Sequence, residues 1–183
     1  MDVQVHNFLL GSCANGPGIR NTVWFQGCTL CCPECFNPGT HDPNAGKTLT
    51  VEQVCDRLLD PNCPCDGITI SGGEPFQQPD ALFSLLKMLR EKAAPPILVF
   101  SGYTEEEIMQ DPVRRACAEL ADAMICGPYR PDEGSDLNQY ISSRNQKLIL
   151  ISNRLTCNDF QNLPLREIII DQEGKLIISG IIP

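Results

Sequence analysis

Short apolar strands alternate with amphipathic helices along this chain, and that alternation limits its fold more than any other feature. Parallel strands need a crossover between them, usually a helix, so the alternation predicts an α/β fold with a mostly parallel sheet. We expect one domain over residues 1–183, a partial (β/α) barrel of about six mostly parallel strands. The expected strands are residues 3–10, 21–27, 67–71, 96–100, 122–126 and 147–151, and the expected helices are residues 50–59, 81–92, 104–110 and 113–122.

Local signals place the helix starts and the end of the chain. Thr50 stands three residues before Gln53, the spacing of a capping box, and Thr104 and Asp111 are expected to cap the next helices. The tail reads "EIIIDQEGKLIIS", with aliphatic runs on both sides of Glu173-Gly174. This pattern predicts a C-terminal hairpin over residues 166–179, at an edge of the fold.

The composition excludes several classes of function. The chain has 183 residues and a formal net charge of −9, which disfavours binding to a nucleic-acid backbone. No apolar run is long enough to cross a bilayer, and the N-terminal residues show no basic signal region, so we expect a cytoplasmic protein without a membrane partner. The 11 cysteines are an odd number, which fits reduced, metal-bound thiols better than a disulfide framework.

Four cysteines lie within eight residues of the segment "GCTLCCPECF", and four explanations compete for them: disulfides, zinc, a four-thiolate iron–sulfur site, or a site one ligand short. Zinc usually takes a second, well-separated ligand pair, which is not obvious here, and ferredoxin spacings do not fit. The spacing C-x3-C-x2-C, made by Cys28, Cys32 and Cys35, fits a [4Fe–4S] cluster with one iron left open for a ligand. Cys31 is then a spectator.

Four unusual segments each follow an expected strand. They are the cysteine loop and the segments at residues 71–75, 101–104 and 126–129, which read "SGGEP", "SGYT" and "CGPY". Since ligands bind beyond the carboxyl ends of parallel strands, the four segments are expected to meet at one rim of the sheet.

These motifs carry a family resemblance. The run "CTLCCPECF" resembles the cluster signature of radical S-adenosylmethionine enzymes, and "SGGEP" resembles their glycine-rich segment. "NGPGIRNTVWFQGC" is similar to the run before the cluster in glycyl-radical activating enzymes. "VFSGYTEEEI", "ADAMICGPY" and "SSRNQKLI" resemble one branch, the anaerobic ribonucleotide reductase activating proteins. The similarity covers residues 7–150.

The resemblance implies both a chemistry and its residues. A reduced [4Fe–4S] cluster would cleave S-adenosylmethionine to a 5′-deoxyadenosyl radical, and that radical would abstract hydrogen from a glycine of a partner glycyl-radical enzyme. The electron would come from a flavodoxin or ferredoxin. Cys28, Cys32 and Cys35 would hold the cluster, and the residues expected to hold S-adenosylmethionine are Glu34, Cys35, Phe36, Ser71, Gly72, Gly73, Glu74, Ser101 and Gly102.

Other interpretations stay open at this point. A small radical enzyme that modifies a peptide or a small molecule would carry the same motifs, and an electron-transfer or zinc-binding module would explain the cysteines alone. Arg20 is expected either to bind a carboxylate or to form a salt bridge. Cys126 stands where related activating enzymes often have an acidic residue. Cys55, Cys63 and Cys65 form a further group without an assigned role.

Overall fold

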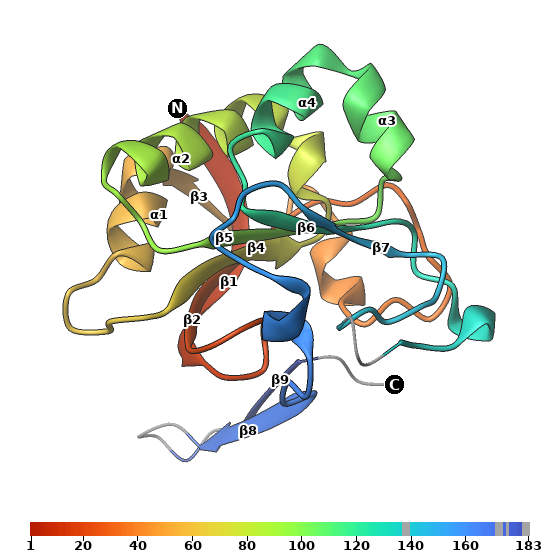
Figure 1. The fold of residues 1–183 in the computed structure, drawn as a ribbon. Helices are drawn as coiled ribbons and strands as arrows, with labels where there is room; N and C mark the ends of the chain where they lie inside the picture. The colour runs from red at the N-terminus through yellow and green to blue at the C-terminus, as the bar shows by residue number, and fades with distance from the viewer. Residues whose placement is uncertain (137–139, 171–173, 175, 181–183) are drawn as a thin grey trace.

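The computed structural model describes residues 1–136, 140–170, 174 and 176–180. Its centre is a seven-stranded sheet of order β3-β1-β2-β4-β5-β6-β7 (Figure 1). Four neighbouring strands run parallel: β2 (Arg20–Phe25), β4 (Gly67–Gly72), β5 (Ile97–Ser101) and β6 (Ala123–Cys126). Three further strands pair antiparallel at the two sides: β1 (Asp2–Ser12), β3 (Lys47–Thr50) and β7 (Lys147–Leu150).

The α/β prediction is confirmed, but the strand directions differ from it at both sides of the sheet. Among the described residues, no α-helix separates β1 from β2 or β6 from β7, so neither pair has the helical crossover typical of parallel neighbours. The strand β3 was not predicted, because it is short and follows directly after the breakers of the cysteine loop. The sheet is open, since β3 and β7 form its two edges.

The helices start where the sequence predicts. Thr50 and Gln53 form a reciprocal capping box, as do Thr104 and Glu107, and Asp111 accepts hydrogen bonds from the first turn of the next helix. The α-helices are α1 (Val51–Leu58), α2 (Pro79–Glu91), α3 (Glu105–Gln110) and α4 (Pro112–Ala118), and the 3-10 helices are η1 (Pro38–Thr40), η2 (Pro75–Gln77), η3 (Pro131–Glu133) and η4 (Cys157–Phe160). None of the described helices is both long and apolar enough to pass through a bilayer.

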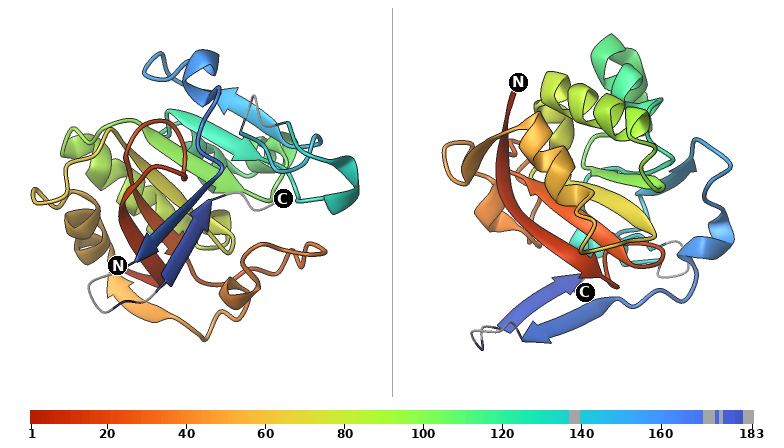
Figure 2. Two further views of the ribbon diagram at one scale, coloured as in Figure 1. Left: turned by 90° about the horizontal axis from the view of Figure 1, so that it is seen from below. Right: turned by 90° about the vertical axis from the view of Figure 1, so that its left-hand side faces the viewer.

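The α-helices cover one face of the sheet, and the C-terminal part of the chain lies on the other (Figures 1 and 2). On the helical side, the aliphatic stripe of α2, with Leu82, Leu85 and Leu89, packs against the core residues of β4 and β5. On the far side, Leu98 and Ile125 of the sheet join a second buried cluster with residues 140–165. The helices and the C-terminal part of the chain cover the two faces of the sheet. The four special segments meet at the carboxyl ends of the parallel strands.

The strands β8 (Arg166–Ile170) and β9 (Leu176–Gly180) form a separate antiparallel pair. It lies on the side of the sheet away from the helices (Figure 2). Glu167 accepts hydrogen bonds from the Ser12 hydroxyl and, at 3.0 Å, from the backbone N–H of Cys13. The expected turn at Glu173-Gly174 lies largely outside the described residues. The outward face is aliphatic and exposed, with Ile168, Ile170, Leu176 and Ile178.

Arg20 lies at the start of β2, and its side chain is completely buried. Its Nε donates to the Thr69 hydroxyl at 2.6 Å, and its terminal nitrogens donate to the carbonyl oxygens of Pro17, Ile68 and Pro96. Burial lowers the pKa of Arg20 to about 10. The expectation of a carboxylate ligand or a salt bridge is wrong, because its hydrogen-bond partners are a hydroxyl group and backbone carbonyls.

Asp122, at the start of β6, is a second buried anchor. Its carboxylate accepts hydrogen bonds from the Ser152 hydroxyl at 2.5 Å and from the Ile97 N–H at 2.7 Å, and Arg90 lies 3.0 Å away. Burial works to raise the pKa of Asp122, but these donors outweigh it and hold the pKa below its ordinary value. Asp122 therefore joins the amino ends of β5 and β6 to α2 and to the segment after β7.

Candidate functional site

The four special segments line one pocket of about 140 Å³ at the carboxyl ends of β2, β4, β5 and β6. This location follows from the register, which aligns Phe25 with Gly72 and Ser101 with Cys126. The lining residues are Cys28, Leu30, Cys32, Cys35, Phe36, Asn37, Ser71, Gly72, Gly73, Phe100, Ser101, Gly102, Gly127, Tyr129, Ser142 and Gln146.

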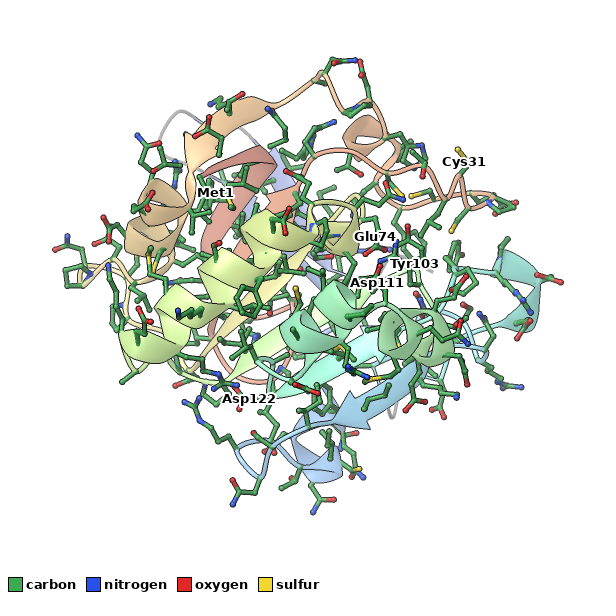
Figure 3. The ribbon with its side chains drawn as sticks, turned by 90° about the horizontal axis from the view of Figure 1, so that it is seen from above. Met1, Cys31, Glu74, Tyr103, Asp111 and Asp122 are labelled. Atoms are coloured by element: carbon green, nitrogen blue, oxygen red, sulfur yellow. The ribbon has the colours of Figure 1, made fainter. Side chains whose placement is uncertain are left out.

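Three of the four loop cysteines face this pocket. Cys28, Cys32 and Cys35 line it and are half-buried, whereas Cys31 is exposed and lies further out on the loop (Figure 3). Cys31 and Glu34 have positive φ angles of 50° and 53°, a conformation that costs energy in residues other than glycine. Both residues with positive φ lie outside the pocket lining, and Cys31 is therefore not among the thiols that face the pocket.

The surroundings of Cys28 and Cys35 disfavour the charged form of these two thiols. Burial raises the pKa of Cys28, and the nearby acidic groups of Glu74, Cys32 and Cys35 raise it further, while a backbone hydrogen bond from Leu30 lowers it. Burial likewise raises the pKa of Cys35. The Asn37 N–H donates to the Cys35 sulfur at 3.4 Å, the kind of contact that tunes iron–sulfur ligands.

These residues fit a [4Fe–4S] cluster with three protein ligands. All eleven cysteines are free thiols, and the three that line the pocket are those of the C-x3-C-x2-C spacing. In the described part of the chain, no three His, Cys, Asp or Glu side chains form a site for a single metal ion. A cube is a different case, because its irons each take a separate thiolate.

Gly72 and Gly73 line the pocket, and the protein itself requires them to be glycines. A Cβ on Gly72 would lie 2.2 Å from the Phe25 nitrogen, and its φ of 121° suits glycine alone. A Cβ on Gly73 would lie 2.2 Å from the Gly27 carbonyl oxygen. Their small size therefore allows β4 to pass close to the cysteine loop, in addition to any role toward a ligand.

Glu74 is completely buried behind the pocket wall, next to Tyr103 in Figure 3. One carboxylate oxygen accepts from the Phe76 N–H at 2.9 Å and the Ser101 hydroxyl at 3.0 Å. The other accepts from the Gly102 N–H at 2.7 Å. The side chain thus joins the segment after β4 to the segment after β5, and it does not belong to the pocket lining.

A pH dependence of stability follows from this burial. Removal from water raises the pKa of Glu74 from 4.5 to about 7, against the opposing effect of its three hydrogen bonds. An acid with a raised pKa in the folded state stabilises the fold below pH 4.5, and this contribution is lost as the pH rises through about 7. Relative to Glu74→Gln, the wild type should lose about 3 kcal/mol of unfolding free energy across that window.

Urea unfolding of both cluster-free proteins, on either side of the window, measures this difference. Glu74→Gln is the reference because glutamine keeps the shape of the side chain but does not titrate. Parallel pH profiles for the two proteins would contradict the prediction.

Of the remaining residues predicted to hold S-adenosylmethionine, all but one line the pocket. Ser71, Ser101 and Gly102 line the pocket, and a Cβ on Gly102 would lie 2.5 Å from Leu30 of the cysteine loop. Glu34 is exposed and does not line the pocket.

The other cysteines discussed above are placed apart from the pocket lining. Cys126 is buried in the core below it, where burial raises its pKa to about 11. Cys55 is also in the core, and Cys63 and Cys65 are half-buried.

Tyr129 is a pocket residue that the sequence reasoning did not select. Its ring centroid lies 4.5 Å from that of Phe36, with the planes inclined by 41°. Phe36 and Tyr129 thus form an aromatic corner at the pocket, suited to a flat apolar group. The sequence did contain a signal for this residue, because Tyr129 belongs to "CGPY", one of the segments that follow an expected strand. Leu30, Phe100 and Gln146 also line the pocket, and they lie in quoted segments but were not selected as site residues.

The chain matches the family model described as a 4Fe-4S single cluster domain over residues 14–149. It is 37% identical over 114 residues to the pyruvate formate-lyase-activating enzyme of Clostridium pasteurianum, covering 58% of this chain and 48% of that protein. It is 28% identical over 157 residues to the pyruvate formate-lyase 1-activating enzyme of Escherichia coli K12, covering 84% of this chain and 59% of the relative.

A third relative is closer in length. The chain is 29% identical over 136 residues to the anaerobic ribonucleoside-triphosphate reductase-activating protein of Escherichia coli K12, covering 71% of this chain and 87% of that protein. The chain thus spans about half the length of the first relative and three fifths of the second. The matched family region contains all four segments that line the pocket.

Proposed function

This chain belongs to the 4Fe–4S single cluster domain family, within the radical S-adenosylmethionine superfamily, and from that premise we propose that it is an activating enzyme for a glycyl-radical protein. The observation that carries the proposal is the shared pocket, in which Cys28, Cys32 and Cys35 face the ends of three neighbouring strands. An electron carrier has no need of such a ligand pocket beside its cluster.

A [4Fe–4S] cluster held by Cys28, Cys32 and Cys35 would supply the electron for reductive cleavage of S-adenosylmethionine to methionine and a 5′-deoxyadenosyl radical, which would take hydrogen from a glycine of the partner. The chain itself holds and shields the ligand. Cys28, Cys32 and Cys35 donate the three thiolates. Phe36, with Tyr129 beside it, offers an apolar face for the adenine.

The polar groups at the ends of β4 and β5 would hold the amino-acid end of S-adenosylmethionine. Ser71, Gly72 and Gly73 present backbone groups and a hydroxyl at the end of β4, and Ser101 and Gly102 do so at the end of β5. Glu74 fixes the relation between these two strand ends through its hydrogen bonds to Ser101 and Gly102. We assign Glu74 a positioning role, because its own oxygens are buried and already occupied.

The open sheet suits a macromolecular substrate. Its edges β3 and β7 do not pair with each other in the described residues, and the closure of the sheet into a partial barrel stays a prediction. A loop of a partner protein would enter the pocket at the carboxyl ends of the central strands. A flavodoxin or a ferredoxin would deliver the electron.

Product analysis tests the function. The anaerobic, cluster-loaded and reduced protein should convert S-adenosylmethionine to methionine and 5′-deoxyadenosine, measured by chromatography. With a glycyl-radical protein present, electron paramagnetic resonance should show a radical on the partner. Absence of 5′-deoxyadenosine from fully loaded protein would support the electron-transfer interpretation instead, and cleavage without a partner radical would support a small radical enzyme with another substrate.

Replacing Glu74 with alanine should weaken S-adenosylmethionine binding by about tenfold, because the Ser101 and Gly102 donors lose their acceptor and the pocket wall loosens. Iron and sulfide contents should stay at wild-type values, since Glu74 binds no iron in this proposal. Equilibrium binding to the loaded protein measures the change. Exposed Glu119 provides the control, and equal affinities for Glu74→Ala and Glu119→Ala would refute the positioning role.

A further inference from the structure

A second cavity, of about 230 Å³, lies between β1, the end of β2 and β9. We call it the hairpin pocket, and the residues that matter here are His6, Trp24, Phe36, Asn37, Ile177 and Ser179. Its outer wall comes from the C-terminal hairpin, which Figure 2 shows across the sheet face opposite the helices. Asn15 fixes that wall by donating to the Ser179 hydroxyl at 2.8 Å.

The hairpin pocket adjoins the cluster pocket. Phe36 and Asn37 line both cavities, so the two pockets share part of their walls. A molecule in the hairpin pocket would therefore contact the residue proposed to cover the adenine. This continuity ties the second cavity to the proposed chemistry.

The residues that line the hairpin pocket suit a ligand without charge. Aromatic and aliphatic groups from Trp24, Phe36 and Ile177 alternate with amide and hydroxyl groups. Among the lining residues that the structure describes, none is Asp, Glu, Lys or Arg. Within the described residues, the indole N–H of Trp24 donates to no acceptor, and His6 bonds only through Nδ1, to Gln26 at 2.8 Å. Apolar walls with unused hydrogen-bonding groups match an extended, uncharged peptide.

We propose that the hairpin pocket binds the residues beside the target glycine of the partner and that Ile177 and Ser179 of the hairpin make this site selective for uncharged residues. The inference rests on the proposed function, because the partner's peptide would lie in this pocket while its glycine is at the adjoining cluster pocket. Trp24 and His6 would bond the peptide backbone, and Ile177 would pack against its small side chains.

Calorimetry on the anaerobic, cluster-loaded protein tests the selectivity. The probes are two capped peptides, acetyl-Val-Ser-Gly-Ser-Val-amide and its counterpart with Lys in place of both Val residues. The wild type should prefer the neutral peptide. Ile177→Asp should weaken neutral binding by at least about tenfold and reverse the preference toward the lysine peptide, because an unpaired carboxylate would then face the pocket.

The same substitution at Ile168 is the matched control. Ile168 lies on the outward face of the same hairpin and is 63% exposed, so Ile168→Asp should leave the affinity for both peptides unchanged. Equal weakening by the two variants would overturn the proposal. A readout that needs no variant comes from Trp24, the only tryptophan of the chain, whose emission should change saturably with the neutral peptide.

Two results separate this inference from the function on which it rests. Formation of 5′-deoxyadenosine without any saturable change of Trp24 emission would overturn the proposal that the hairpin pocket binds a peptide, and it would leave the proposed enzyme function standing. Peptide binding with the expected selectivity, but no cleavage of S-adenosylmethionine, would support the pocket as a peptide site and count against the enzyme function.

Discussion

Alanine at position 32 will abolish cluster assembly and, with it, all measurable cleavage of S-adenosylmethionine. Cys32 is the middle of the three thiols that line the pocket, and the two that remain leave a second iron without a protein ligand. Cys28→Ala and Cys35→Ala should behave in the same way. Iron and sulfide per chain after anaerobic reconstitution, together with chromatography of 5′-deoxyadenosine, measure the effect.

The neighbouring cysteine is the control for this experiment. Cys31 is exposed, has a positive φ and does not line the pocket, so Cys31→Ala should keep wild-type iron, sulfide and activity. Loss of the cluster in Cys31→Ala, with retention in Cys32→Ala, would move the ligand set to Cys31.

Truncation of Arg20 to alanine should lower the free energy of unfolding by about 4 kcal/mol, because it leaves a cavity and removes the donors to one hydroxyl and three carbonyl oxygens. Domains of this kind are stable by only about 5–15 kcal/mol, so the variant should be close to unfolding at ordinary temperature. Urea denaturation followed by circular dichroism measures the loss.

Two further substitutions show whether burial is the cause. Arg20→Lys keeps the charge but offers fewer donors, and it should lie between the wild type and Arg20→Ala. Arg115 is exposed on α4, and Arg115→Ala should change stability by less than about 0.5 kcal/mol. A similar loss at Arg115 and Arg20 would show that the buried hydrogen bonds contribute little.

Local signals in the sequence predicted much of this structure. Thr50, Thr104 and Asp111 cap helices as expected, because capping depends on residues only a few positions apart. The rule that ligands bind at the ends of parallel strands predicted which segments meet, since it needs only the order of the elements.

Contacts between distant segments were harder to predict. The hydrogen bond from the Gly102 N–H to Glu74 was not predicted, although the two segments were expected to meet, because it depends on how β4 and β5 are aligned. The reason for glycine at position 73 is a backbone oxygen of Gly27, 46 residues earlier in the sequence. The prediction that Arg20 binds a carboxylate or forms a salt bridge failed for the same reason, because its carbonyl partners come from three separate segments.

The buried anchors Arg20 and Asp122 lie at the amino ends of their strands, whereas the pocket lies at the carboxyl ends. The sheet therefore has these two buried, hydrogen-bonded charged residues at the strand ends that lie away from the cluster pocket, where oxygen damage to a cluster would not reach them. A chain that loses its iron should persist as a folded scaffold rather than as a target for proteases. Repair after exposure to air would then require only new iron, sulfide and electrons, and no new protein synthesis.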